Sequence, residues 1–315
     1  MAHKSGFVNI VGSPNVGKST LMNQLVGERL SIITSKAQTT RHRIMGIVNS
    51  DDFQIVYSDT PGMIKPNYKM QEGMMQFVTT AVSDADVFLM VTDVEEEKPS
   101  NEELWDKVAK TSTPKLLIIN KIDLVDQKKL EEIVESWAKK IPGVSILPIS
   151  ALNGINHEFV LQWILKNLPE GPPYFEKDQL TDKSERFFAC EIIREKILLN
   201  YDKEIPYSVE VEVESFKREK KITRIAAVIY VARDSQKSIV IGHQGSMLKK
   251  VGMEARIELE AFLQEKVFLE KYAKCCKCLG FESVKRNQIK NKILSCLSTF
   301  NSLFKKNILD GLISL

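Results

Sequence analysis

Gly12-Ser13-Pro14-Asn15-Val16-Gly17-Lys18-Ser19 is the stretch of sequence that decides the fold of the first half of the chain. It matches the pattern G-x-x-x-x-G-K-[ST], whose glycines let backbone N–H groups converge on phosphate oxygens. An apolar run over residues 7–12 precedes it as an expected strand, and residues 19–28 follow as an expected helix whose N-terminus favours an anion. Lys18 is expected to reach the β- and γ-phosphates, and the Ser19 hydroxyl to ligate Mg²⁺. The loop therefore predicts a nucleoside triphosphate site.

Apolar strands and helical stretches alternate beyond this loop. Further strands are expected over residues 53–58, 87–92, 115–120 and 145–149. Further helices are expected over residues 101–111, 127–140 and 157–167. This alternation predicts an α/β fold with a mostly parallel sheet and helices on both faces. Because such sheets bind ligands outside the carboxyl ends of their strands, motifs at strand ends are the candidate site.

Asn120-Lys121-Ile122-Asp123 follows a buried strand and indicates which base is bound. A carboxylate at Asp123 accepts two N–H groups, which guanine offers side by side and adenine does not. Each charge-assisted hydrogen bond is worth about 1.5–3 kcal/mol, so two of them suffice to select guanine. Ser150-Ala151-Leu152 follows the last strand and is expected to lie behind the guanine base.

Two more segments are expected beside the phosphates. Asp59-Thr60-Pro61-Gly62 ends a strand, and we expect Asp59 to hold the Mg²⁺ shell and the Gly62 N–H to face the γ-phosphate. Gln38-Thr39-Thr40-Arg41 lies in the polar stretch between the first helix and the strand over residues 53–58. A threonine there can complete the Mg²⁺ shell, and we favour Thr40 over Thr39. The expected metal ligands are thus Ser19, Thr40 and Asp59.

A proline-rich boundary divides the chain. Residues 168–173 read Leu-Pro-Glu-Gly-Pro-Pro, through which no helix continues. We expect a nucleotide-binding domain over residues 1–169, a linker over 170–184, a second domain over 185–274 and a tail over 275–315. In the second domain we expect a helix over 186–201, a strand hairpin over 207–231, a helix over 247–264 and a third strand over 267–272.

Ile241-Gly242-His243-Gln244-Gly245 is a candidate RNA-binding loop, and Lys249 and Lys250 follow it. A G-x-x-G loop lets the backbone approach a sugar-phosphate chain while single-stranded bases lie in the adjoining groove. The pattern alone is common, but here it continues as Leu-Lys-x-Val-Gly-x-x-Ala-Arg behind a strand hairpin. The alternative is a structural corner between two helices.

With these motifs in order, residues 5 to about 272 resemble the Era family of bacterial GTPases, in the translation-factor class, and the second domain resembles a type II KH domain. The resemblance implies a GTP-hydrolysing switch that binds single-stranded 16S ribosomal RNA and acts in small (30S) subunit assembly and 16S RNA maturation. It implies that the ordered switches reposition the KH domain, with Lys18, Thr40 and Gly62 as catalytic residues. The expected GTP contacts are Gly12, Ser13, Pro14, Asn15, Val16, Gly17, Lys18, Ser19, Thr20, Asp59, Thr60, Pro61, Gly62, Asn120, Lys121, Asp123, Ser150, Ala151 and Leu152.

Two residues and two rival functions leave alternatives open. Met63 stands where many GTPases place the glutamine that orients water, so slow intrinsic hydrolysis is expected. In related GTPases the residue at Asn15 helps hold a potassium ion, so activation by potassium and its absence are both open. The main rival function is a tRNA-modification-type GTPase. A membrane ion-transport GTPase is disfavoured, because no run of 18 or more apolar residues exists.

Composition and charge set the remaining expectations. Apolar residues make up 43% and charged residues 27% of the 315 residues, as in ordinary globular proteins. The N-terminus does not read as a secretion signal, so we expect a cytoplasmic, unprocessed monomer. Residues 271–315 carry nine Lys or Arg against two acidic residues. Such a basic end is typical either of contact with a polyanion, such as nucleic acid or an anionic membrane surface, or of a solvated charged tail. The tail reads as an amphipathic helix, whose alternatives are docking on the KH domain, peripheral membrane contact or a reading-frame change.

Overall fold

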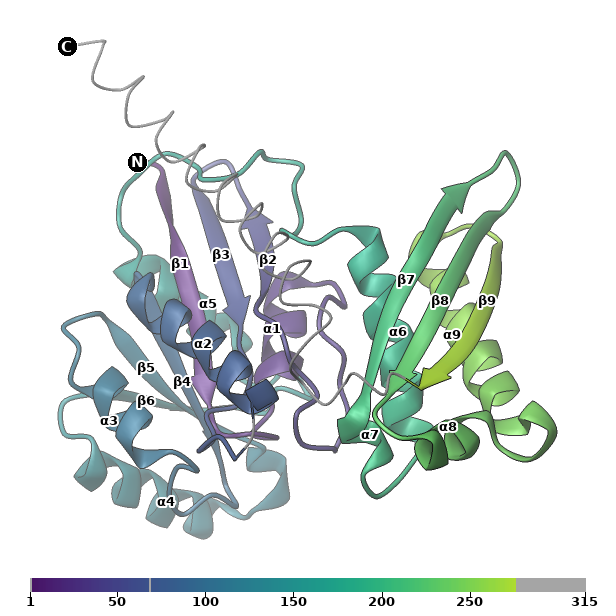
Figure 1. The fold of residues 1–315 in the computed structure, drawn as a ribbon. Helices are drawn as coiled ribbons and strands as arrows, with labels where there is room; N and C mark the ends of the chain where they lie inside the picture. The colour runs from purple at the N-terminus through teal and green to yellow at the C-terminus, as the bar shows by residue number, and fades with distance from the viewer. Residues whose placement is uncertain (1, 68, 276–315) are drawn as a thin grey trace.

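The structure, a computed structural model, describes residues 2–67 and 69–275 as two domains (Figure 1). The amphipathic segment of the tail lies outside the described residues. The strands of the first domain are β1 (Lys4–Gly12), β2 (Ile44–Asn49), β3 (Phe53–Asp59), β4 (Val87–Asp93), β5 (Lys115–Asn120) and β6 (Ser145–Pro148). Its helices are α1 (Lys18–Val26), α2 (Lys69–Ser83), α3 (Glu102–Ala109), η1 (Ile122–Leu124), α4 (Gln127–Lys140) and α5 (His157–Asn167). In the described ranges we find no helix with the length and apolar character to cross a bilayer.

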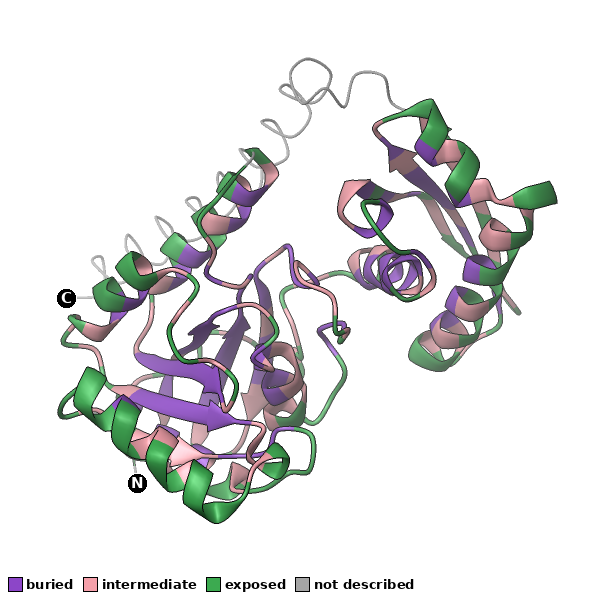
Figure 2. Ribbon diagram, turned by 90° about the horizontal axis from the view of Figure 1, so that it is seen from below, coloured by how far each residue is buried: buried purple, intermediate pink, exposed green. Residues whose placement is uncertain are grey.

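The first domain is a sheet with helices on both faces, which confirms the predicted fold class. The strand order is β2-β3-β1-β4-β5-β6, with β2 antiparallel to β3 and the other neighbours parallel. Side chains of successive strand residues enter two separate cores. Ile10 packs in the core shared with α1 and α5, whereas Val11 packs in the core shared with α2, α3 and α4. Figure 2 shows the strands buried and the outer faces of the helices exposed.

The edge strand β2 and the helix α2 are present where the sequence predicted no element. β2 is an edge strand of only six residues, paired on one side with β3, and it directly follows a polar segment. α2 contains Gly73 and several β-branched residues, which are weak helix formers. Its buried residues recur every three or four positions, at Gln71, Met74, Val78 and Ala81. Packing on the sheet therefore stabilises α2 where local propensity does not.

The second domain packs its helices on one face of a three-stranded sheet (Figure 1). Its elements are α6 (Glu185–Asn200), α7 (Ile205–Ser208), β7 (Val209–Arg218), β8 (Thr223–Val231), α8 (Asp234–Ile241), η2 (His243–Gly245), α9 (Ser246–Leu263) and β9 (Val267–Cys275). β7 and β8 are antiparallel, and β8 and β9 are parallel. The core joins α6 and α9 to the sheet through Ile193, Ile197, Val251 and Ala255. Helix α6 precedes the three strands, in the order that we expect for the second domain.

The linker is bound to the first domain along the edge strand β2. The Ile47 N–H donates to the Leu180 carbonyl at 2.8 Å, and the Thr181 hydroxyl donates to the Met45 carbonyl at 2.6 Å. The side-chain oxygen of Gln54 accepts the backbone N–H of Tyr174 at 2.7 Å. These contacts cover a sheet edge that would otherwise expose unpaired backbone groups. The connection therefore fixes where the second domain starts.

Candidate functional site

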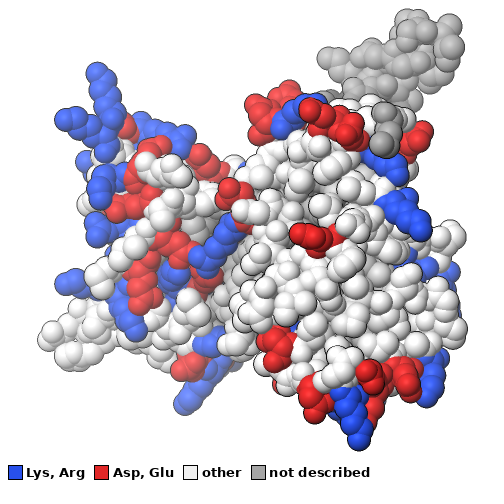
Figure 3. Space-filling view, turned by 180° about the vertical axis from the view of Figure 1, so that it is seen from behind, with Lys and Arg blue, Asp and Glu red and all other residues white. Residues whose placement is uncertain are grey.

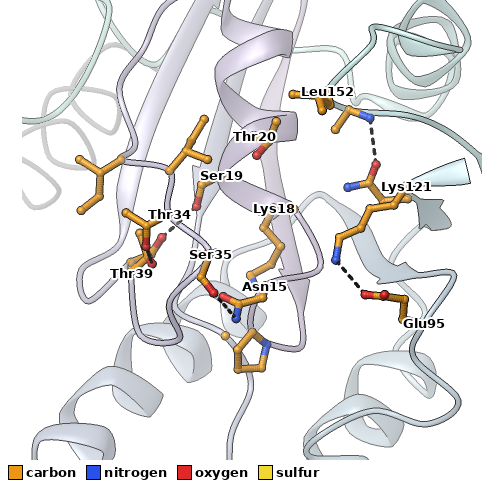
Figure 4. A pocket seen from close by; sticks show the side chains of 18 of the residues that line it. Asn15, Lys18, Ser19, Thr20, Thr34, Ser35, Thr39, Glu95, Lys121 and Leu152 are labelled. Carbon is orange, nitrogen blue, oxygen red and sulfur yellow. Dashed lines mark hydrogen bonds and ion pairs between the residues drawn. The ribbon is translucent and has the colours of Figure 1, made fainter. Parts of the chain in front are cut away.

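A cleft of about 640 Å³ lies at the carboxyl ends of β1, β3 and β5, beside the N-terminus of α1 (Figure 4). Most of the expected GTP contacts line it: Pro14, Asn15, Gly17, Lys18, Ser19, Thr20, Thr60, Gly62, Asn120, Lys121, Asp123, Ala151 and Leu152. The other expected contacts are buried in the same loops: Gly12, Ser13, Val16, Asp59, Pro61 and Ser150. The fold thus brings all the sequence motifs of the first domain to one place.

The loop before α1 has a backbone conformation at residue 17 that leaves no room for a side chain. Gly17 has a φ of +94°, and the side-chain amide of Asn120 fills the place that a Cβ would occupy. Asn120 Nδ2 donates to the Val16 carbonyl at 2.8 Å, and Asn120 Oδ1 accepts the Ala151 N–H at 2.9 Å. Asn120 therefore ties the phosphate loop to the segment expected behind the base.

The ammonium of Lys18 is buried inside this loop. It donates to the Ser13 carbonyl at 2.6 Å. Burial lowers the pKa of Lys18 from 10.5 to about 8, and the carboxylates of Asp59 and Glu96 oppose this shift. A buried cation that is only partly compensated is stabilised by an incoming anion. Lys18 is thus prepared to receive a phosphate group.

Ser19, Thr40 and Asp59 come together from three separate segments. Ser19 Oγ donates to Asp59 Oδ2 at 2.7 Å and lies 2.9 Å from Thr40 Oγ1. Asp59 Oδ1 is buried without a hydrogen-bond partner among the described residues, and burial raises the pKa of the Asp59 carboxyl. Oxygen donors of this kind suit Mg²⁺. A cation here would satisfy the unpartnered oxygen and favour the charged carboxylate, so the residues fit the expected metal.

Thr39 and Thr40 have different neighbours. Thr40 Oγ1 lies 3.3 Å from Asp59 Oδ2. Thr39 Oγ1 instead donates to the Lys36 carbonyl at 2.6 Å and lies 2.7 Å from Thr34 Oγ1. The geometry therefore favours Thr40 as the metal ligand, as expected from the sequence.

Gly62 lies at the surface of the cleft, whereas the side chain of Met63 points away from it. Gly62 lies at the cleft, where a Cβ would approach Pro14 N at 2.7 Å. Met63 is fully buried in the core beneath α2, and its N–H donates to the Gly12 carbonyl at 2.9 Å. Its side chain therefore takes no part in the cleft surface. Slow intrinsic hydrolysis stays a prediction.

The other end of the cleft carries the expected base contacts. Asp123 Oδ1 accepts a hydrogen bond of 2.5 Å from Ser150 Oγ. Lys121 crosses the mouth of the cleft, and its ammonium lies 2.5 Å from Asp93 Oδ2 and 3.7 Å from Glu95 Oε2 (Figure 4). The Ser150 contact fixes the Asp123 carboxylate and leaves Oδ2 for the N–H groups of a base. This arrangement is able to hold guanine by the chemistry expected from the sequence.

A further wall of the cleft was missed by sequence reasoning. It consists mainly of residues between α1 and β2, with single additions after β4 and β5: Ile32, Ile33, Thr34, Ser35, Glu95 and Leu124. The Asn15 side-chain amide donates to the Ser35 carbonyl at 3.1 Å and so attaches this wall to the phosphate loop. No motif marks the wall, because its residues contribute position rather than a recognisable chemical group.

The same wall is held from its other side by the second domain. Arg194, on α6, donates a hydrogen bond of 2.5 Å to the Thr39 carbonyl and forms a buried ion pair with Glu191. Arg41 donates to the carbonyls of Val209 at 2.7 Å and Pro206 at 3.0 Å. The segment that carries Thr40 is therefore fixed to the second domain.

Two more cations of the first domain contact the second. Arg29 pairs with Glu195 at 2.5 Å and also contacts Glu258. Lys36 lies 3.0 Å from Asp202. Glu191, Arg194 and Glu195 are each at most 5% exposed. Sequence reasoning missed this charged interface, since charged residues on a helix usually indicate its solvent side.

The candidate RNA-binding loop is accessible on the second domain. Gly242 and Gly245 have φ values of +71° and +78°, which favour glycine. His243, Gln244, Lys249 and Lys250 are exposed, and Ile241 is half-buried. On the face seen in Figure 3, lysine and arginine side chains of this domain are intermingled with acidic side chains. Among the described residues on that face, no single-sign surface competes with the loop as the candidate RNA contact.

Comparison with known proteins agrees with both domains. Residues 7–121 match a family model described as 50S ribosome-binding GTPase, and residues 204–275 match a KH domain model. The chain is 42% identical over 276 residues to GTPase Era of Ruminiclostridium cellulolyticum and 45% identical over 277 residues to GTPase Era of Geotalea uraniireducens. In both cases the match covers 87% of this chain and 93% of the relative.

Two solved structures are similar over the same length. One is Era in complex with MgGDPNP and nucleotides 1506–1542 of 16S ribosomal RNA, and the other is a variant of Aquifex aeolicus Era bound to GDP.AlF4⁻. Each superposes with a TM-score of 0.83 at 39% identity and covers 87% of this chain and 94% of its own.

Proposed function

The chain belongs to the Era family of GTPases, and from this premise we propose that GTP controls how its KH domain holds single-stranded 16S ribosomal RNA during small-subunit assembly. Its reaction is the hydrolysis of GTP to GDP and phosphate. One observation carries the proposal. The Thr40 hydroxyl contacts Ser19 at the proposed metal site, and the carbonyl of the preceding Thr39 accepts a hydrogen bond from Arg194 of the KH domain.

The proposed ligands follow from the site and from the relatives. A solved Era structure contains MgGDPNP and a 16S ribosomal RNA segment. In this chain, Ser19, Thr40 and Asp59 would hold Mg²⁺, which when bound supplies charge for the β- and γ-phosphate oxygens. Asp123 would bind guanine, and the Gly242–Gly245 loop would bind the RNA backbone.

Hydrolysis would rest on charge and positioning. Lys18 would neutralise charge that develops on the transferred phosphoryl group, and the Gly62 N–H would face the same group. Thr40 would close the metal shell only while the γ-phosphate is present. Asn15 is a candidate for holding potassium, and hydrolysis rates in KCl and NaCl at equal ionic strength would decide between activation and its absence.

Coupling between the domains would work by population shift. Binding of the triphosphate favours the position of Thr40 that completes the metal shell, and the neighbouring Thr39 carbonyl moves with it. Arg194 follows that carbonyl, and its ion pair with Glu191 belongs to α6, which is packed in the KH core. A ligand shifts such an equilibrium only by its differential affinity for the two arrangements. RNA and GTP would therefore each favour the arrangement that the other prefers.

Capture of ribosomal subunits tests this function. The immobilised full chain is incubated with separated small and large subunits in the presence of a GTP analogue or GDP. We expect capture of small subunits, and more of it with the analogue. The family model of the first domain is described by 50S binding, so the large subunit is the matched comparison. Preference for the large subunit would contradict the proposal. Family membership already favours it over the tRNA-modification and ion-transport rivals.

A further inference from the structure

Lys271 occupies an unusual place in the KH domain, on the helix-facing side of the edge strand β9. Burial alternates along β9, and Lys271 shares its inner side with Leu269 and Ala273. Its side chain crosses α9 at Gly252, where Cδ, Cε and Nζ fill the place that a Cβ would occupy. An alanine at residue 252 would collide with this side chain. Gly252 therefore makes room for Lys271.

The ammonium of Lys271 is held in this place without a counter-charge. It has no ion pair or hydrogen bond with any described residue, whereas Lys274 on the outer face of the same strand lies 3.1 Å from Glu214. Burial lowers the pKa of Lys271, and no carboxylate within residues 2–67 or 69–275 opposes this shift. A half-buried ammonium with three N–H donors and no acceptor among the described residues can donate to a ligand. Lys271 therefore marks a position for an acceptor.

The position lies close to the Gly242–Gly245 loop. Gly252 is seven residues beyond Gly245 on α9, which corresponds to about 10 Å along the helix. Lys249 and Arg256 are three residues before and four residues after Gly252, so they share its side of the helix, and both are exposed. Exposed cations and the loop suit the phosphate chain, which stays at the surface. Lys271 is only partly buried, so its ammonium would meet a base that turns inward rather than the phosphate chain.

We propose that Lys271 reads the edge of one base of the bound single strand and favours guanine there over adenine. The proposal rests on the RNA binding proposed above and adds a residue that determines specificity. Guanine presents two neighbouring acceptors, N7 and O6, whereas adenine replaces O6 with an N–H₂ donor that would oppose an ammonium. Because one ammonium makes fewer hydrogen bonds than a bidentate side chain, we expect the affinity for guanine to exceed that for adenine by about fivefold, the lower end of the range for base contacts.

The test uses ten-nucleotide oligouridine strands that contain one guanine or one adenine, moved through every position. Fluorescence anisotropy measures their affinity for the full chain and for Lys271→Met, which keeps the length and packing of the side chain. We expect one position at which the parent prefers guanine about fivefold, and we expect Lys271→Met to lose that preference while it binds plain oligouridine as before. Lys271→Arg should restore the preference. Lys274→Met is the control and should keep it.

The outcomes separate this proposal from RNA binding itself. If Lys271→Met keeps the guanine preference, or if the parent has none while it binds RNA, the base-reading role is overturned. A uniform loss on all strands, with a salt slope reduced by about 0.7, would mean a phosphate contact instead and would also overturn it. If the parent binds no single strand at all, the failure lies in the proposed RNA binding.

Discussion

Arg194 of the KH domain donates a hydrogen bond of 2.5 Å to the carbonyl oxygen of Thr39 in the GTPase domain. The next residue, Thr40, lies with its hydroxyl 2.9 Å from Ser19 Oγ at the proposed metal site. Only the peptide unit between Thr39 and Thr40 therefore separates the proposed metal site from the contact with the KH domain. Because Arg194 is also paired with Glu191 in a buried position, loss of one partner alone would leave an uncompensated charge.

Guanine selectivity depends on Asp123. Changing Asp123→Asn should weaken GTP and GDP binding by roughly tenfold to a hundredfold, because about 1.5–3 kcal/mol of charge-assisted bonding is lost. Asp126→Asn is the matched control, since Asp126 caps α4 and does not line the cleft. Titration of a labelled GDP measures both variants. Equal affinity of the parent for ATP and GTP would remove the basis of the guanine assignment.

Hydrolysis depends on Lys18 and Ser19. Lys18→Ala removes the buried cation on the phosphates, and Ser19→Ala removes a metal ligand, so each should abolish measurable phosphate release. Lys107→Ala, an exposed substitution on α3, should hydrolyse GTP at the parental rate. Release of inorganic phosphate from GTP measures all three. Parental rates in both cleft variants would show that the phosphate loop has been assigned wrongly.

Nucleotide affinity should depend on pH through Lys18. Burial lowers the pKa of Lys18 to about 8, so the free protein loses this charge as the pH rises through that value. The bound phosphate requires the charged form and raises the pKa again. Affinity for GDP should therefore be constant below about pH 8 and about tenfold weaker one pH unit above it. Titrations from about pH 7 to 9, with circular dichroism to verify folding, check this. A flat profile would indicate that Lys18 stays charged throughout.

RNA binding should depend on the exposed residues of the G-x-x-G loop. Changing His243→Asp and Gln244→Asp together should weaken single-stranded RNA binding at least tenfold, because two carboxylates would face the phosphate chain at short range. GDP binding should stay unchanged. Ala261→Asp with Gln264→Asp is the control, since it adds the same charge about 24 Å further along α9, beyond the screening length. Unchanged RNA affinity in the loop variant would make the loop a structural corner.

Much of the fold and the nucleotide site could be predicted, because each motif is short and lies at the end of a buried strand. Lys18, Asp59 and Asn120 are each identified by their immediate neighbours, and the parallel sheet then brings them together. β2 and α2 were not predicted, because their stability comes from packing against β3 and the sheet rather than from their own residues.

The contact between the domains could not be predicted from the sequence. Glu191, Arg194 and Glu195 read as the polar side of a helix, yet all three are buried against the segment between α1 and β2. Glu191 and Arg194 pair with each other, but the contacts of Arg194 and Glu195 to the first domain join residues more than 150 positions apart, which leave no local pattern. The recessed position of Lys271 could not be predicted either, because it depends on Gly252, which lies on another element.

The dependence of RNA affinity on the bound nucleotide tests the central claim most directly. Affinity for a single strand from the 3′ end of 16S ribosomal RNA is measured with the full chain bound to a GTP analogue and then to GDP. We expect binding to be at least about fivefold tighter with the analogue, which corresponds to the lower end of typical coupling energies. The same two titrations on the Glu191→Gln, Arg194→Met double variant, which removes both partners of the buried pair, should give equal affinities. Equal affinities in the parent, or an undiminished difference in the double variant, would contradict the claim that the Thr39–Arg194 contact couples the two sites.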